Sequence, residues 1–223
     1  MPAKVVELDE DRAAMVRRLR SIGVDLDYLL VEHKADDDPA THAAVAQAAH
    51  ATTAPSHGWT PDDLPTDPPP ATVGERLAVG DLFGANFDRA RGELLVVPPA
   101  GVLVGLRPDD RPAIGWGPYV WTDRPDADHL VWWTPSDPRF GSYTTCFTWS
   151  PRADGASPAS IAELFVEANE VLLGGPPDSA VAYQWPVEWG ADDREARWGS
   201  GYVWTLRLDG TRFLAVCAWD DEA

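Results

Sequence analysis

The sequence predicts an α+β fold in which a mostly antiparallel, Trp-rich sheet carries helices packed on one face. About eight short segments rich in Val, Tyr, Phe, Trp and Thr follow residue 93, separated by Pro, Gly and Asp clusters. Residues 160–173 interrupt them with a strong apolar period of the helical kind. The chain before this strand-rich part is helical in character. Many strands with a single strong helix among them favour antiparallel pairing.

The N-terminal part of the chain predicts two helices. Residues 9–20 begin with acidic and end with basic side chains, which is the order that the helix macrodipole favours. Residues 25–32 (DLDYLLVE) fit either a strand or one more helical turn. Asp38 and Pro39 then provide a cap and a first-turn proline for an alanine-rich helix. Because Val45 is its single larger apolar residue, we expect a close-packed or peripheral helix that buries little.

A Pro/Asp-rich segment divides the chain. Residues 59–71 contain PDDLPTDPPP, whose composition predicts an extended, semi-rigid linker. The predicted organisation is therefore a helical N-terminal region at 1–58, the linker at 59–71 and an α+β domain at 72–223. Thr72 and Glu75 form a capping-box pattern, which predicts a short helix at the start of this domain.

The α+β domain ends in a predicted hairpin. Asp209 and Gly210 lie between two apolar runs, and the tolerance of glycine for positive φ suits a tight turn there. Both strands are apolar on both faces, so we expect them at the centre of the sheet, covered on both sides. The strand candidates are residues 93–98, 101–106, 118–122, 129–134, 142–150, 180–185, 202–208 and 212–219.

The charge of the chain excludes several partners. Its 223 residues include 36 Asp and Glu against 18 Lys and Arg, a formal charge of −18. Nucleic acids and anionic bilayers are disfavoured, because binding phosphate requires a basic surface. No apolar run approaches the ~18 residues of a membrane span, and the first residues lack the apolar segment of a secretory signal. We expect a soluble, cytoplasmic protein with no nucleic-acid or membrane partner, and the excess of Arg over Lys is typical of GC-rich bacterial genomes.

Motifs for catalysis or metal binding are absent from the sequence. It contains no G-x-S-x-G, Walker A, G-x-G-x-x-G, H-E-x-x-H or C-x-x-C pattern. Cys146 and Cys217 are expected to be buried free thiols. The five histidines do not have the spacing of a helical metal pair, and we expect them at the solvated surface. The sequence therefore predicts no catalytic residue, no metal and no cofactor.

The tryptophans indicate a binding site. Ten of the eleven lie between Trp116 and Trp219. Adjacent indoles at 132 and 133 must face opposite sides of a strand, so one of them can contact a ligand or partner. Tryptophans mixed with acidic residues in a predicted turn are typical of an interface hot spot, although indoles also pack over sheet edges. The candidate binding residues are Trp133, Trp185, Trp189, Asp192, Asp193, Glu195 and Trp198.

Three functions fit these observations. The first is a non-enzymatic acidic binding protein that engages a basic protein partner, in the manner of an immunity protein or antitoxin, because charge complementarity speeds association and Trp anchors supply affinity. The second is a small-molecule-binding protein or enzyme with a Trp-lined cavity between sheet and helix. The third is a structural or assembly component whose N-terminal region docks elsewhere.

Overall fold

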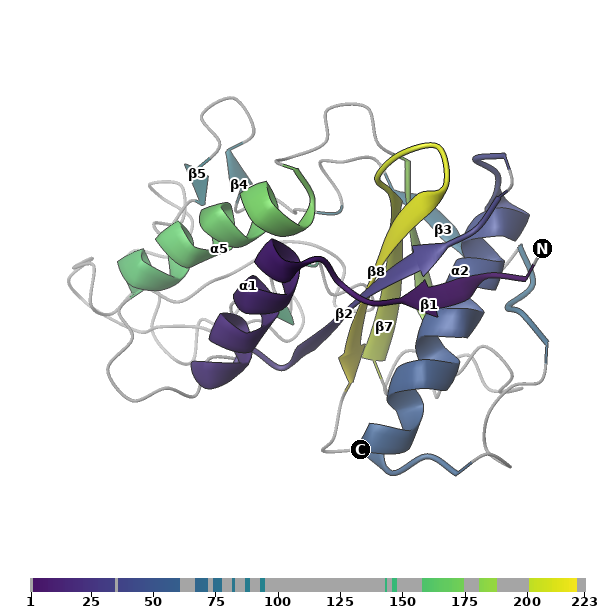
Figure 1. Ribbon diagram of the computed structural model, residues 1–223, viewed down its shortest axis with the longest axis horizontal. Coiled ribbons are helices and arrows are strands. Elements are labelled where there is room, and N and C mark those ends of the chain that lie inside the picture. Colours follow the sequence, from purple (N-terminus) through teal and green to yellow (C-terminus); the bar gives the residue numbers. More distant parts are fainter. Residues whose placement is uncertain are drawn as a thin grey trace, which may run out of the picture.

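The centre of the molecule is an antiparallel sheet between two layers of helices (Figure 1). The computed structural model describes residues 2–34, 36–60, 67–71, 74–77, 82, 87–88, 93–94, 143, 146–147, 158–174, 181–187 and 201–219. The strands of the sheet are β1 (Lys4–Val6), β2 (Leu26–Glu32), β3 (Glu75–Leu77), β6 (Ala182–Pro186), β7 (Gly201–Arg207) and β8 (Arg212–Trp219). A separate pair is formed by β4 (Phe87–Asp88) and β5 (Glu93–Leu94).

Three α-helices whose bounds lie in the described part of the chain accompany the sheet. They are α1 (Glu10–Ser21), α2 (Pro39–Thr53), which continues into the 3₁₀ turn η1 (Ala54–His57), and α5 (Pro158–Leu172). The strands lie in the order β1-β2-β8-β7-β6-β3, and every neighbouring pair is antiparallel. The predicted α+β class is therefore confirmed. So are the strands expected at 180–185, 202–208 and 212–219 and the helix expected at 160–173.

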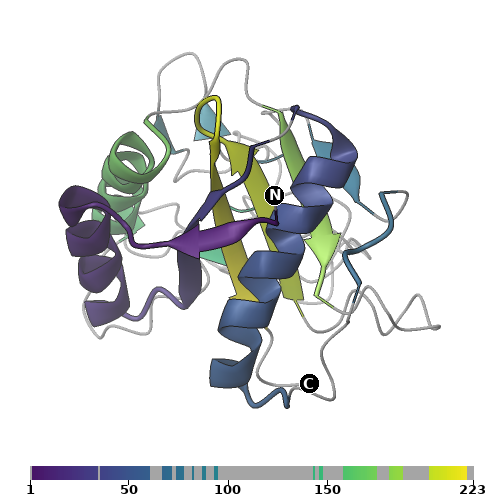
Figure 2. The same ribbon diagram turned by 45° about the vertical axis from the view of Figure 1, so that its right-hand side comes forward.

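The prediction that helices cover one face of the sheet is wrong, because they cover both. Figures 1 and 2 show α2 on one side of the sheet and α1 with α5 on the other. The physical reason lies in the last hairpin, whose strands alternate between two apolar cores. Trp204 and Val216 face α1 and α5, whereas Val203 and Cys217 face α2. This hairpin is central and covered on both sides, as expected from its composition.

The N-terminal segment contributes strands to the same sheet as the end of the chain. Of the two alternatives for residues 25–32, the structure has the strand, and β2 pairs with β8 from Leu26 opposite Ala218 to Glu32 opposite Arg212. Helix α2 lies close against this sheet. Its buried alanines have no side chain beyond Cβ, so the helix axis can approach the strands closely.

Two local predictions are wrong. Residues 142–150 were expected to form a strand, but Tyr143, Cys146 and Phe147 are helical. A helix places positions 143 and 147 on one face, where both rings contact Phe165 of α5, with centroids 5.5 and 5.0 Å away. Glu75 begins β3 instead of lying in a short helix, because residues 75–77 pair with β6. In both segments packing overrides local sequence preference.

The turn of the β7–β8 hairpin is held by the side chain of Asp209. One carboxylate oxygen accepts hydrogen bonds from the backbone N–H groups of Thr211 and Arg212, both at 3.0 Å. The other oxygen pairs with the Arg212 guanidinium at 2.6 Å. Gly210 is not among the described glycines with positive φ. The hairpin is thus confirmed, but a side-chain turn rather than a left-handed glycine shapes it.

We expect Asp209→Ala to lower the free energy of unfolding by about 1–2 kcal/mol, since it removes two hydrogen bonds to backbone donors and one ion pair. Asp209→Asn retains an acceptor oxygen and should lose less than half of that amount. Urea unfolding followed by circular dichroism measures both. Equal losses in the two variants would show that the charge, and not the turn geometry, stabilises the hairpin.

Candidate functional site

Helices α1 and α5 pack side by side and leave a groove between them. Met15 and Leu19 of α1 and Phe165 and Leu172 of α5 are buried in the core beneath them. The guanidinium of Arg12 donates from Nε to the carbonyl oxygen of Leu172, 3.2 Å away, at the last turn of α5. A cation at this end of a helix is favourable, because the final carbonyls lack intrahelical partners. The two helices are therefore fixed against each other by both core packing and a cap.

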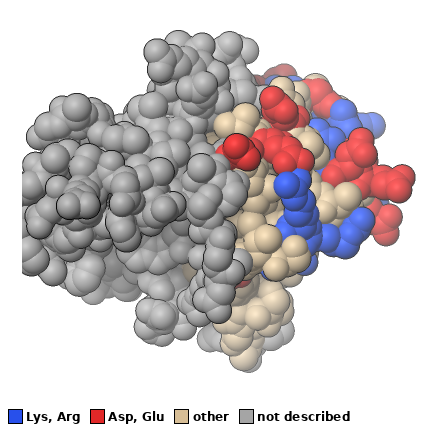
Figure 3. Space-filling view, turned by 90° about the vertical axis from the view of Figure 1, so that its left-hand side faces the viewer, with Lys and Arg blue, Asp and Glu red and all other residues tan. Residues whose placement is uncertain are grey.

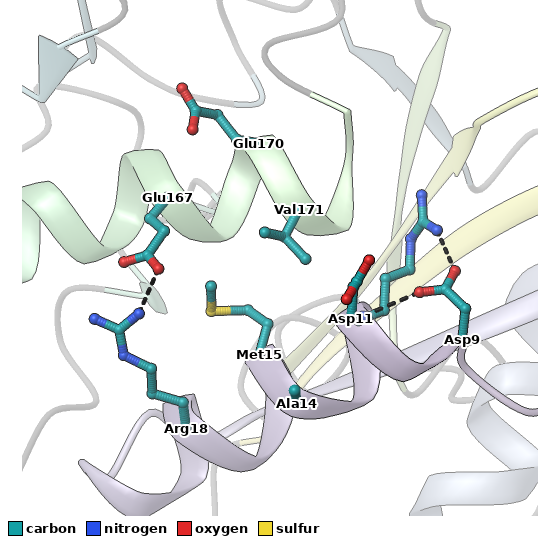
Figure 4. A pocket seen from close by; sticks show the side chains of 9 residues that line it. Asp9, Asp11, Ala14, Met15, Arg18, Glu167, Glu170 and Val171 are labelled. Atoms are coloured by element: carbon teal, nitrogen blue, oxygen red, sulfur yellow. Dashed lines mark hydrogen bonds and ion pairs between the residues drawn. The ribbon is translucent and has the colours of Figure 1, made fainter.

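The groove has a volume of about 630 Å³ and an apolar floor with a charged rim. Figure 4 shows Met15 of α1 pointing toward α5 and Val171 of α5 pointing toward α1. Acidic and basic side chains stand side by side on the described part of this end of the molecule (Figure 3). The residues that line the groove are Asp9, Asp11, Arg12, Ala14, Met15, Arg18, Glu167, Glu170 and Val171.

The two arginines of the groove already have carboxylate partners. Arg12 pairs with Asp9, the N-cap of α1, and Arg18 pairs with Glu167 across the groove. The backbone N–H of Arg12 holds the pKa of Asp9 below its usual value. Four carboxylates and two guanidinium groups line the groove, so two negative charges, those of Asp11 and Glu170, are left over. The groove is thus an acidic surface with a small apolar centre.

A second polar arrangement lies on the other face of the sheet, under α2. The indole N–H of Trp185 donates to Thr205 Oγ1 over 3.3 Å, and this oxygen lies 2.8 Å from His42 Nδ1. His42 Nε2 lies 2.8 Å from Asp37 Oδ1. An indole N–H can only donate and an ionised carboxylate can only accept, so the chain runs one way. In the neutral imidazole, Nε2 therefore carries the proton and donates it to Asp37, and Nδ1 accepts from the Thr205 hydroxyl.

This series of hydrogen bonds contains the residue types of a nucleophile, a base and an orienting acid, but a substrate cannot reach these side chains. The side chains of Thr205 and His42 are 0 % exposed. Because a nucleophile must reach a substrate atom, Thr205 cannot act as one in this structure. These hydrogen bonds instead connect the first turn of α2 to β7.

The expectation that the histidines are solvated is wrong for His42 and His50, which are 0 % and 1 % exposed. His50 packs against the rings of Trp59 and Trp219, with centroids 5.6 and 5.3 Å away. The two indoles also contact each other, with centroids 5.9 Å apart, so the three rings form one cluster. The reason is the close approach of the alanine-rich helix, which buries every sheet-facing side chain, polar or not. Burial lowers the pKa of His42, partly offset by the hydrogen bond to Asp37, and lowers the pKa of His50 to about 4.

Trp185 is placed in the core rather than at a rim. It is 0 % exposed on β6, and Gly74 lies directly over its ring. The other candidate binding residues lie outside the described residues: Trp133, Trp189, Asp192, Asp193, Glu195 and Trp198.

The groove residues did not emerge from sequence reasoning, although a signal was present. The apolar stripe of α5 predicts the helix, and the signal lies on the opposite stripe. Glu163, Glu167 and Glu170 recur at spacings of four and three, which places three carboxylates on one exposed face of the helix. What the sequence could not supply is the neighbour of this stripe, because α1 lies about 150 residues earlier in the chain.

Both cysteines are free thiols, and burial raises the pKa of each to about 12, which makes them poor nucleophiles. Within the described ranges, no three His, Cys, Asp or Glu side chains gather in a way that could hold a metal ion. None of the described helices has the length and apolar character needed to cross a membrane.

No family model, no curated protein and no solved structure matches this chain. The class of function is therefore inferred from the geometry of the groove and the charge of the chain.

Proposed function

We propose that this protein is a non-enzymatic acidic binding protein that engages a basic segment of a protein partner in the α1–α5 groove. The observation that carries the proposal is the charge of the groove after its internal ion pairs are counted. Arg12 and Arg18 are each occupied by a carboxylate, and Asp11 and Glu170 have no described cation beside them. A basic side chain entering the groove would find these two charges available.

The apolar floor supports the same kind of partner. Met15 and Val171 lie between the acidic rims, at a place where the aliphatic stem of a lysine or arginine can be buried while its charged end reaches a carboxylate. Methionine is unbranched and adapts its shape, so the floor can accept more than one arrangement of the incoming side chain. The groove therefore favours a basic, partly apolar segment over a small neutral molecule.

The charge of the whole chain acts in the same direction. At −18 it attracts basic proteins over distances up to about the Debye length, roughly 10 Å at 0.1 M salt, and raises the rate of encounter. This is the behaviour by which an immunity protein or antitoxin captures a basic toxin quickly. We propose this inhibitory role as the specific form of the function, with a basic toxin as the partner.

The test is a binding measurement with defined peptides. We expect a synthetic amphipathic peptide of leucine and arginine to bind the full chain at about 50 mM salt and to be released at about 500 mM, while a leucine and glutamate peptide of the same pattern does not bind. The double variant Asp11→Asn, Glu170→Gln should bind the basic peptide about tenfold more weakly. Fluorescence anisotropy of the labelled peptide measures both effects.

The matched control is Glu32→Gln with Asp36→Asn, which also removes one Glu and one Asp charge, but from exposed positions outside the groove. If this control weakens binding as much as the groove variant, general electrostatic attraction and not the groove holds the peptide, and the proposed site is wrong. The candidate residues of the predicted turn stay a proposal, and Trp189→Ala in the same assay tests whether that turn adds a second contact.

A further inference from the structure

The contact between α2 and the sheet contains two buried imidazoles, one near each end of the helix. His42 in the first turn faces Tyr183 and Phe213, with ring centroids 4.5 and 5.3 Å away, and bonds to Thr205 as described above. His50, two turns later, packs against both Trp59 and Trp219. Among the described residues, His42 and His50 are the buried histidines, and both lie on the α2 side of the sheet.

The charged groups around His42 act in opposite directions. The carboxylates on its side are those of Asp37, bonded to Nε2, and Asp38, the N-cap of α2. Arg207 of β7 stands 4.0 Å from Asp37 and disfavours a second positive charge nearby. Burial has the largest effect, so the pKa of His42 is lowered in spite of the neighbouring carboxylates.

The surroundings of His50 stabilise a positive charge much less than those of His42. The rings of Trp59 and Trp219 pack against it, and Val187 provides a backbone hydrogen bond. On the same face of the sheet, Asp27 of β2 bonds to His57 at 3.0 Å and to Arg20 at 2.8 Å. His57 also stacks on Trp219, the ring that contacts His50, with centroids 4.8 Å apart.

We propose that α2 is an acid-sensitive cover of the sheet: lowering the pH from about 7 to about 5 raises the population in which this helix is released from its face, while the α1–α5 face stays packed. The physical reason is linkage. A histidine that is free in the released state binds a proton near pH 6.5, but the buried His50 resists it, so acid favours the released state. This inference does not depend on the proposed function, because the groove lies on the opposite face.

The size of the effect follows from the two pKa values of His50. With about 4 in the packed state and 6.5 in the released state, the released population should rise about twentyfold between pH 7 and pH 5. The sign is fixed by the lower pKa of the packed state: packing is strongest above pH 6.5 and weakens as the pH falls toward 4.

The two cysteines report on the two faces separately. Cys217 lies in the core under α2, and Cys146 packs against the core under α1 and α5. Cys146→Ala therefore leaves the buried thiol of Cys217, which reports release of α2, and Cys217→Ala leaves the partly buried thiol of Cys146 as the comparison from the other face. Each can be followed with a pyridyl disulfide, with rates divided by those of a small free thiol at the same pH.

We expect the normalised labelling rate of Cys217 to rise about twentyfold between pH 7 and pH 5, with less than a twofold change for Cys146. His50→Phe, whose ring is never charged, should remove most of the rise. An unchanged rate for Cys217 would overturn the proposal. An equal rise at both thiols would overturn it as well, because it would mean that the whole fold opens. A full rise that persists in His50→Phe would show that this histidine is not the sensor.

Amide hydrogen exchange of the unmutated chain keeps the test decisive if His50→Phe does not fold. The protection of residues 39–53 should fall at pH 5 relative to that of residues 158–172, after correction for intrinsic exchange rates. Parallel loss in the two helices would again rule out a selective release of α2.

Discussion

Replacing Trp185 by alanine is expected to lower the free energy of unfolding by about 3–5 kcal/mol, the cost of removing a large buried aromatic side chain. The indole is 0 % exposed and stacks on Tyr183, with centroids 5.9 Å apart and planes at 21°. An added Cβ at Gly74 would lie 2.2 Å from ring atoms, so the backbone of that residue covers the ring. The void left by alanine cannot be filled by small shifts of these neighbours.

Trp185→Ala also removes the donor at the start of the hydrogen-bonded chain through Thr205 and His42. Trp185→Phe separates the two effects, because it keeps most of the ring volume and loses the N–H; we expect a loss of about 1–2 kcal/mol. Urea unfolding followed by far-ultraviolet circular dichroism measures both variants. If Trp185→Ala lowers the free energy of unfolding by less than about 1 kcal/mol, the indole does not pack in the core. That result would favour the predicted role of Trp185 in binding.

The fold was predictable where the residues of one segment determine the position of that segment in the sheet. The last hairpin is apolar on both faces, which indicates a central position, and the order β2-β8-β7-β6 bears this out. The sequence predicted the helix at α2 but left open whether it is close-packed or peripheral, because its alanines give a weak apolar signal; the structure has the close-packed alternative. Their small size is the reason that the helix packs so closely. In α2, the weak hydrophobicity of the alanines indicates a helix close to the sheet rather than an exposed helix.

The sites were harder to predict than the fold. His42 and Asp37 are five residues apart, but Thr205 is contributed by a strand near the other end of the chain. Likewise, Arg18 and Glu167 meet across the groove from helices that the sequence separates by 149 positions. A pattern within one segment can give the face on which a side chain lies. It cannot give the second segment that completes a site.

Gly201→Ala should be among the most destabilising single substitutions in the chain, lowering the free energy of unfolding by at least about 3 kcal/mol. Gly201 begins β7 with φ at +123°, a region that side chains other than glycine rarely adopt, and an added Cβ would lie 2.0 Å from the carbonyl oxygen of Ala218. Since both atoms belong to paired backbones, no side-chain rotation relieves the overlap.

The structural result should appear at the neighbouring residue of β8. Gly201 is paired with Trp219, whose ring contacts His50 and stacks on His57, so separating the strands at this end moves the indole away from both imidazoles. We therefore expect a changed near-ultraviolet circular dichroism spectrum together with the lower unfolding midpoint. Gly210→Ala, in the turn of the same hairpin, meets no atom within 4 Å and should stay within about 0.5 kcal/mol of the unsubstituted protein. Similar losses in the two variants would mean that the close approach of β7 and β8 at Ala218 is not a feature of the folded protein.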